Sequence, residues 1–151
     1  MAIRFETKPL MLLACGLAFL LAAKSTTSTP ATPNPQLYMT RAEVFEQGAK
    51  TFIRYRYDVF NKDQYPASMF AAAPELPPCG LNTKASRTWV DVFDPKGTRL
   101  NRFCAFGNPK DLGSIWFALE QGAVPPSYVF IVLTDRKTSA KYKSNLADTT
   151  L

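Results

Sequence analysis

The chain has 151 residues, a formal net charge of +6 and no histidine. Hydrophobic residues make up 46% of it and charged residues 20%, which is typical of a folded chain of about one domain. The absence of histidine excludes the usual general base at neutral pH, the commonest metal ligand and any Ser-His or Cys-His nucleophile.

The N-terminus has the pattern of a secretory signal peptide, which we place at residues 1–25. Arg4 and Lys8 precede an apolar run over residues 9–23, which is short for a membrane span. An uncleaved anchor is the alternative. Leu-Leu-Ala-Cys15 also resembles a lipobox, so lipidation of Cys15 is a second alternative. We therefore expect a periplasmic or secreted protein.

Residues 26–36 are rich in Ser, Thr and Pro and carry almost no side chain that could join a core. We expect a linker there, followed by one domain over residues 37–146 and a tail over 147–151.

The first two predicted strands cover residues 37–44 and 52–60. The first is ambiguous, because Thr40-x-x-Glu43 also imitates a helix capping box. In the second, apolar and charged side chains alternate clearly, which predicts one buried and one solvent-exposed face. Its outer arginines are candidates for an anion-binding surface. The predicted inner residues are Ile53, Tyr55, Tyr57 and Val59, and the outer ones are Arg54, Arg56 and Asp58.

Residues 61–86 form a long predicted loop, because Pro74, Pro77 and Pro78 prevent regular structure in its second half. Long loops in compact domains are often functional or pinned to the body. Pinning by apolar contacts and a crosslink is a sufficient explanation here, but this loop is also the first choice for a binding surface. The candidate binding loop comprises Met69, Phe70, Glu75, Leu76, Pro77 and Pro78.

A hairpin over residues 86–106 lies at the centre of the sequence. Its arms are rich in aromatic and β-branched residues, and Asp94-Pro-Lys-Gly97 supplies the turn. In an oxidising compartment, an isolated cysteine pair is usually a disulfide, which predicts a bond between Cys79 and Cys104. Two buried thiols are the alternative, and no Cys-x-x-Cys redox spacing occurs.

Three more strands are predicted at residues 113–119, 127–134 and 141–145. The run over 127–134 is apolar on both faces, which marks a central strand or an edge under a loop. Asp135 and Arg136 beyond it are expected to form a local ion pair. About seven short strands without helical periodicity favour an all-β fold, a two-sheet antiparallel sandwich.

With Trp89 on the third predicted strand and Tyr128 near the start of the sixth, the chain resembles fibronectin type III or immunoglobulin-like domains. This resemblance implies that Trp89 takes the place of the core tryptophan and Tyr128 that of the tyrosine corner. The cysteines do not match the immunoglobulin disulfide. Residues 50–146 are also similar to small exported bacterial proteins without assigned activity, through Ala-Ala-Pro-Glu-Leu-Pro-Pro-Cys-Gly, Ala-Ser-Arg-Thr-Trp-Val-Asp-Val and Tyr-Val-Phe-Ile-Val-Leu-Thr-Asp-Arg-Lys-Thr.

No motif for catalysis, metal or cofactor binding is recognisable. There is no Gly-rich phosphate loop and no Asp-x-Asp-x-Asp calcium spacing. The available carboxylates are expected to form turns or lie on the surface. Aromatic side chains with lysines beside them are candidates for contact with sugars or lipid headgroups. The carboxylates are Asp58, Asp63, Asp91 and Asp94, and the contact candidates are Tyr65, Lys141, Tyr142 and Lys143.

These features predict a non-catalytic binding or structural module that acts through its loops on an envelope or extracellular protein or glycan. Alternatives are an inhibitor of an exported enzyme that uses the Pro-rich loop around Cys79, and a small carboxylate-based hydrolase. The basic charge is too diffuse for nucleic acid. A membrane partner is expected only with a retained leader or a lipidated Cys15.

Overall fold

The structure is a computed structural model that describes residues 31–150. The predicted signal peptide at 1–25, which includes Cys15, and residues 26–30 of the predicted linker lie outside the described residues.

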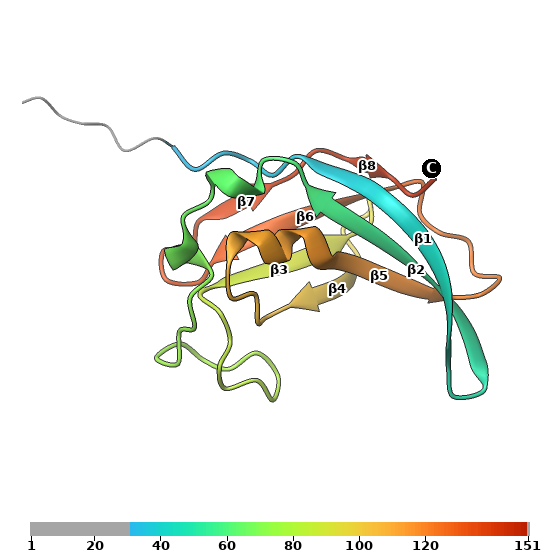
Figure 1. Cartoon of the computed structure of the whole chain (residues 1–151), viewed down its shortest axis with the longest axis horizontal. Helices are drawn as coiled ribbons and strands as arrows, with labels where there is room; N and C mark the ends of the chain where they lie inside the picture. The colour runs from blue at the N-terminus through green and yellow to red at the C-terminus, as the bar shows by residue number, and fades with distance from the viewer. Residues whose placement is uncertain (1–30, 151) are drawn as a thin grey trace, which may run out of the picture. The chain divides into compact units, whose positions relative to one another are not determined.

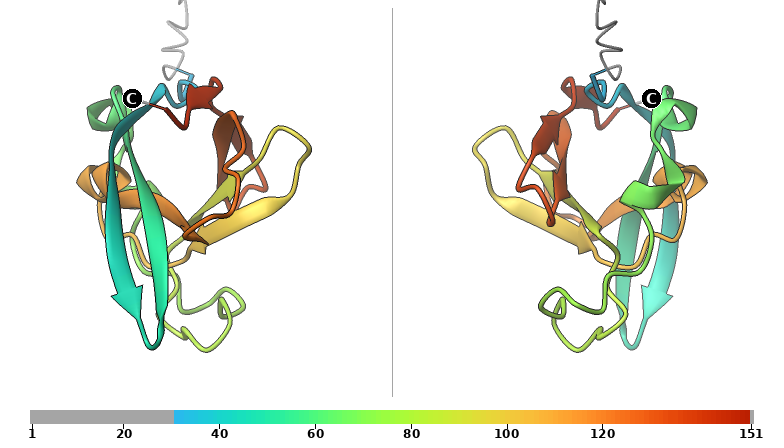
Figure 2. Two further views of the ribbon diagram at one scale, coloured as in Figure 1. Left: turned by 90° about the vertical axis from the view of Figure 1, so that its right-hand side faces the viewer. Right: turned by 90° about the vertical axis from the view of Figure 1, so that its left-hand side faces the viewer.

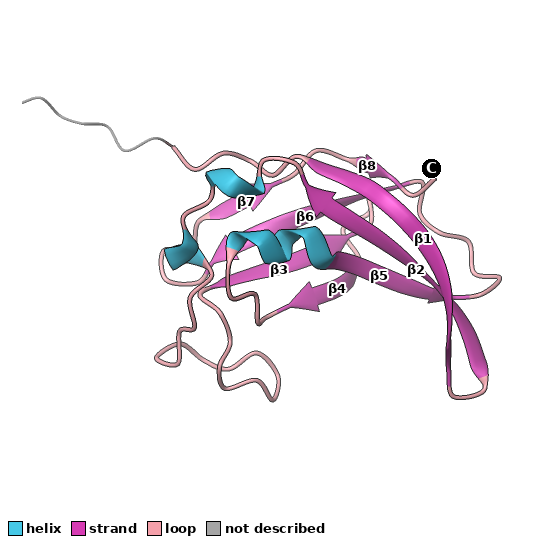
Figure 3. Cartoon of the chain, in the orientation of Figure 1, coloured by secondary structure: helices cyan, strands magenta, loops and turns pink. Residues whose placement is uncertain are grey.

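The described chain consists of eight strands and three short 3-10 helices (Figures 1 and 3). The strands are β1 (Leu37–Gln47), β2 (Lys50–Val59), β3 (Thr88–Phe93), β4 (Arg99–Phe103), β5 (Ile115–Glu120), β6 (Tyr128–Asp135), β7 (Lys141–Lys143) and β8 (Ala147–Asp148), and the helices are η1 (Lys62–Gln64), η2 (Ala67–Met69) and η3 (Pro109–Ser114).

The strands form two antiparallel sheets (Figure 2). One has the order β1-β2-β5, and the other has the order β4-β3-β6-β7, with β8 also paired to β6. The predicted all-β, two-sheet class is therefore confirmed. β6 lies centrally between β3 and β7, which explains why its sequence is apolar on both faces.

Two hairpins follow directly from their turn residues. Gly48 adopts φ 63° between β1 and β2, and Gly97 adopts φ 87° between β3 and β4, a region that favours glycine. Asp94 accepts a hydrogen bond from the Thr98 backbone N–H at 2.7 Å, so its side chain closes the second turn. The predicted central hairpin is thus confirmed.

The core lies between the sheets. The predicted inner face of the second strand is confirmed, since Tyr55, Tyr57 and Val59 are buried and the Tyr55 and Phe117 rings stack 4.8 Å apart. The other core residues come from both sheets, from the 3-10 helices and from the segments that connect them. They are Leu37, Tyr65, Met69, Phe70, Val90, Val92, Phe106, Leu112, Ile115, Val129, Ile131, Leu133 and Ala147.

Asparagine side chains connect the sheets near two of their edges. Asn101 of β4 donates to the Trp116 carbonyl of β5 at 2.8 Å. Asn145, after β7, accepts from the Leu37 backbone N–H at 2.7 Å and donates to the Leu37 carbonyl at 2.9 Å. The Asn145 side chain thus makes the two hydrogen bonds to Leu37 that the backbone of a neighbouring strand would make. Both backbone polar groups of buried Leu37 are therefore satisfied.

We expect Asn145→Ala to lower the free energy of unfolding by about 1 to 3 kcal/mol, because two backbone groups of Leu37 lose their partner. Urea denaturation measures this change. Leu146→Ala, at an exposed neighbouring side chain, is the control and should shift stability by less than about 0.5 kcal/mol. Equal effects of the two substitutions would contradict a bridging role.

The C-terminal segment differs from the predicted tail at 147–151. Ala147 and Asp148 form β8 against β6, Ala147 is buried, and the Thr149 backbone N–H donates to the Ser127 carbonyl at 3.2 Å. Ladder hydrogen bonds and burial of small side chains therefore order a segment that has no strand pattern of its own.

The end of the predicted linker also packs on the domain. The Tyr65 hydroxyl donates to the Pro33 carbonyl at 2.8 Å, and the Gln36 N–H donates to Asn61 Oδ1 at 2.9 Å. Tyr65, expected as an exposed aromatic, is only 3% exposed. It is a core residue whose hydroxyl has a fixed partner, which removes it from the contact candidates.

Helix η3 replaces the start of the predicted strand at 113–119. Pro109 occupies its first turn, and Asn108 and Asp111 form a reciprocal capping box. Leu112 is completely buried, so this short helix is anchored in the core, and β5 begins only at Ile115.

Candidate functional site

Most of the candidate binding loop lies in a small hairpin-like segment that leaves the domain after Phe70 and returns at Arg87. We call residues 71–87 the excursion. At its base the Ala73 N–H donates to the Ala85 carbonyl at 3.0 Å, and the Arg87 N–H donates to the Ala71 carbonyl at 2.8 Å. These bonds place 71–73 beside 85–87, directly before β3. The excursion thus begins and ends next to the start of β3.

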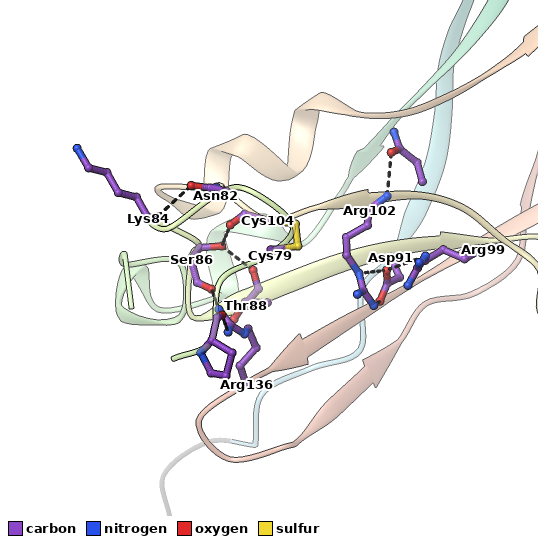
Figure 4. The surroundings of a disulfide bond; sticks show 12 residues. Cys79, Asn82, Lys84, Ser86, Thr88, Asp91, Arg99, Arg102, Cys104 and Arg136 are labelled. Atoms are coloured by element: carbon purple, nitrogen blue, oxygen red, sulfur yellow. Dashed lines mark hydrogen bonds and ion pairs between the residues drawn. A yellow bond between two sulfur atoms is a disulfide. The ribbon is translucent and has the colours of Figure 1, made fainter. Parts of the chain in front are cut away.

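The predicted disulfide between Cys79 and Cys104 is present and connects the excursion to the end of β4 (Figure 4). Its Cα atoms are 6.0 Å apart, an ordinary spacing for a disulfide. The Ser86 N–H donates to the Cys104 carbonyl at 2.6 Å, so the backbone of both segments is also joined. The bond is compatible with the oxidising compartment that the sequence predicts.

Arg136 is a second clamp on the excursion. Its guanidinium lies 4.3 Å from the Trp89 ring centre and donates to the Ser86 carbonyl at 3.3 Å and to the Pro77 carbonyl. Partial burial lowers the pKa of Arg136, and Glu75 opposes that shift. A planar guanidinium can stack and donate in two directions at once, so this residue fixes the Pro-rich arm to the sheet.

The expected ion pair between Asp135 and Arg136 does not form. Asp135 instead binds Arg87 through two hydrogen bonds, at 2.8 and 2.5 Å. Successive residues near a strand end point to opposite faces, which separates the two neighbours.

A tight turn ends the excursion. Cys79 and Asn82 exchange both backbone hydrogen bonds, at 3.2 and 3.0 Å, around Gly80 and Leu81. Gly80 has φ 59°, and Leu81 projects with a relative exposure of 102%. A large apolar side chain is therefore held in water on a turn that a disulfide anchors.

The structure divides the six residues of the candidate binding loop. Met69 and Phe70 are core residues, 4% and 0% exposed, and pin the start of the excursion. Leu76 is half-buried, whereas Glu75, Pro77 and Pro78 are exposed. The accessible part of the candidate binding loop therefore covers residues 75–78, next to the turn.

Sequence reasoning missed Leu81 and Arg136 as parts of this site. The Cys-Gly-Leu-Asn run around Leu81 carries a turn signal, since glycine followed by any residue is a recognised two-residue turn. Arg136 has no comparable signal, because its contacts are to backbone carbonyls far away in the sequence.

We expect Arg136→Lys to loosen the excursion without unfolding the domain. A lysine keeps the charge but cannot stack and donate to two carbonyls together, so trypsin should cleave after Lys84 several-fold faster. Mass spectrometry of reduced digests measures the rate. Arg99→Lys, on a half-exposed side chain of β4, should leave it unchanged, and equal rates in both variants would contradict the clamp.

The carboxylates expected as turn or surface groups mostly have defined partners. Asp91 is 5% exposed and binds Arg102 through two hydrogen bonds, at 2.6 and 2.8 Å. Asp58 pairs with Lys62 at 2.5 Å. Asp94 closes its turn, and the hydrogen bond from Thr98 lowers the pKa of this carboxyl. Asp63 is exposed in η1.

Trp89 does not lie in the core as the immunoglobulin-like comparison predicts. The neighbouring Val90 is fully buried between the sheets, so Trp89 stands on the outer face of β3. There Arg102 lies 4.4 Å from the ring centre. Tyr128 is 44% exposed, which also removes the support for a tyrosine corner.

The outer arginines of β2 are partly paired. Arg54 and Arg56 both bind Glu43 Oε1, at 3.3 and 2.7 Å, and Arg54 also lies over the rings of Phe45 and Trp116. The hydrogen bond from Arg56 lowers the pKa of Glu43. The single carboxylate of Glu43 thus balances only part of the charge that made the strand a candidate anion-binding surface.

Among residues 31–150, no cluster of three or more Cys, Asp or Glu side chains is suited to hold a metal ion. The described part of the chain also has no helix with the length and apolar character that a membrane crossing requires.

Comparison with protein-family models, curated proteins and solved structures found no match. The fold and the site therefore define the class, an all-β two-sheet domain with a disulfide-anchored loop.

Proposed function

We propose that the protein is an exported binding module that inserts the turn around Leu81 into an apolar pocket of an envelope or extracellular protein. One observation carries this proposal: Leu81 is fully exposed on a turn that the disulfide and Arg136 both restrain. A loop that is already ordered loses little conformational entropy on binding, so one apolar anchor contributes more of its burial energy to affinity.

The anchor is adequate in size. Complete burial of a leucine side chain contributes about 1.5 to 3 kcal/mol. The exposed Pro77 and Pro78 beside it add rigid surface.

The proposed relation to fibronectin type III or immunoglobulin-like domains is limited to a shared two-sheet layout, because neither Trp89 nor Tyr128 takes its expected place.

A photoreactive residue at Thr83, two residues from Leu81, tests the proposal. We expect one dominant crosslinked partner in envelope extracts, and we expect Leu81→Asp or reduction of the disulfide to remove it. The same photoreactive residue at Val124, an exposed apolar position elsewhere, is the control. Crosslinking that survives Leu81→Asp, or equal labelling from Val124, would contradict the proposal.

The same experiment separates the alternatives. If the captured partner is an exported enzyme and a stoichiometric amount of the protein lowers its activity, the module is an inhibitor. A carboxylate-based hydrolase requires turnover that an Asp→Asn change abolishes without loss of stability. Asp91 and Asp58 are already bound to cations, so Asp94 or Asp63 would have to carry that activity.

A further inference from the structure

The outer face of the five-stranded sheet has basic side chains along both edges. Arg99 and Arg102 lie on β4, and Lys141 and Lys143 lie on β7. The strand register places Arg102 beside Asp91, and Lys143 beside Val132, on the same side of the sheet. We call Arg99, Arg102, Lys141 and Lys143 the basic face.

Little negative charge balances this face. Asp91 is buried and bound to Arg102 by two hydrogen bonds, with Arg99 3.9 Å away. Lys141 and Lys143 are exposed, and neither has an ion-pair partner among residues 31–150. The two lysines are unpaired within this range, and the two arginines share the single carboxylate of Asp91, so the basic face has a net positive charge.

Three aromatic rings between the two edges already contact cations or one another. Trp89 is in contact with the guanidinium groups of Arg102 and Arg136, Lys143 lies 4.1 Å from the Phe130 ring centre, and Phe93 stacks on Phe130 at 5.4 Å. Stacking on a sugar or a base requires a free ring face. The contacts thus favour a ligand that is recognised by charge.

The spacing of the charges favours a flat ligand over a linear one. Three strand steps separate β4 from β7, which is roughly 14 Å, while residues two apart on β7 lie roughly 7 Å apart. A single polyanionic chain that follows a strand meets two of the cations, whereas a planar anionic surface meets both edges together.

We propose that the basic face docks on the surface of an anionic phospholipid bilayer. This contact needs neither a retained leader nor lipidation of Cys15, and it is independent of the Leu81 turn. The phosphate groups of the lipids approach the lysines on β7 and Arg99 on β4, while Arg102 stays bound to Asp91.

The opposite sheet supplies a matched control. Two cations there have ion-pair partners: Arg41 lies 3.3 Å from Glu43, which Arg54 and Arg56 share, and Lys50 lies 2.9 Å from Glu120. Arg41→Gln/Lys50→Gln removes two positive charges, as Lys141→Gln/Lys143→Gln does, but from the other side of the domain.

Sedimentation of the full-length protein with vesicles tests the proposal. Vesicles of phosphatidylcholine with phosphatidylglycerol are compared with vesicles of phosphatidylcholine alone, which report any binding by residues 1–25. Each lysine near an anionic surface contributes about fivefold to binding, so Lys141→Gln/Lys143→Gln should weaken it about 30-fold. The Arg41/Lys50 variant should weaken it less than about threefold, and 0.5 M salt should abolish it.

Several outcomes would overturn the proposal. Equal losses in the two variants would mean that total charge, and not this face, drives binding. Equal binding to neutral and anionic vesicles, or no binding to either, would exclude charge-based docking. Binding to dextran sulfate without binding to vesicles would assign the face to an acidic polymer. Thermal unfolding of each variant checks that the fold is intact.

Discussion

Replacing both Cys79 and Cys104 by serine is expected to lower the free energy of unfolding by about 3.5 kcal/mol. The bond closes a loop across a sequence separation of 25 residues, and the loop-entropy model gives this value for the restriction of the unfolded chain. Denaturant unfolding measures the change. The excursion keeps its buried Phe70 and its Arg136 clamp, so we expect a folded but less stable domain.

Three comparisons make the disulfide prediction specific. The wild-type protein in reductant should match the double-serine variant, because both remove the same crosslink. Trypsin should cleave after Lys84 faster in both, since the excursion has lost its connection to β4. A double variant as stable as the oxidised protein would show that the crosslink does not limit the unfolded chain.

The sheet pattern of this protein could be predicted because its signals are local. Alternation over residues 52–60 identified the inner face of β2, and the turn residues at 94–97 identified the central hairpin. The pairing of Cys79 with Cys104 followed from the cysteine count and from the expected removal of Cys15 with the signal peptide. Each of these inferences needs only neighbouring residues, or the absence of any other partner.

The remaining features depend on long-range contacts. Strand β8 has two residues and exists because β6 offers a free pairing site. Asn145 and Arg136 act through backbone carbonyls that are distant in sequence. The capping box of η3 was readable, since Asn108, Pro109 and Asp111 are its usual signal, but the apolar residues after it led to a strand prediction.

The misplacement of Trp89 shows the limit of analogy between two-sheet proteins. Strand alternation puts Trp89, Asp91 and Phe93 on one face of β3, but it does not say which face is inside. Val90 and Val92 are the fully buried residues. A tryptophan beside two arginines, Arg102 on β4 and Arg136 directly after β6, can be stabilised outside the core by cation–π contacts, as it is here.

Stability is expected to fall in acid because of the Arg87–Asp135 pair. Hydrogen bonding to Arg87 lowers the pKa of Asp135 from 3.8 to about 2. A depressed carboxyl pKa stabilises the folded state above the ordinary pKa, and the stabilisation is lost as pH falls from about 4 to about 2. The shift corresponds to about 2 kcal/mol.

Asp135→Asn isolates this contribution, because it keeps the shape of the side chain and removes the charge. At pH 7 the variant should be about 2 kcal/mol less stable than the wild type, and the two should converge near pH 2. Urea unfolding at each pH measures the difference. Asp63→Asn, on an exposed helix residue, should follow the wild type at every pH. A difference that stays constant down to pH 2 would instead assign the loss to packing, because protonation of Asp135 would then have no effect on folding.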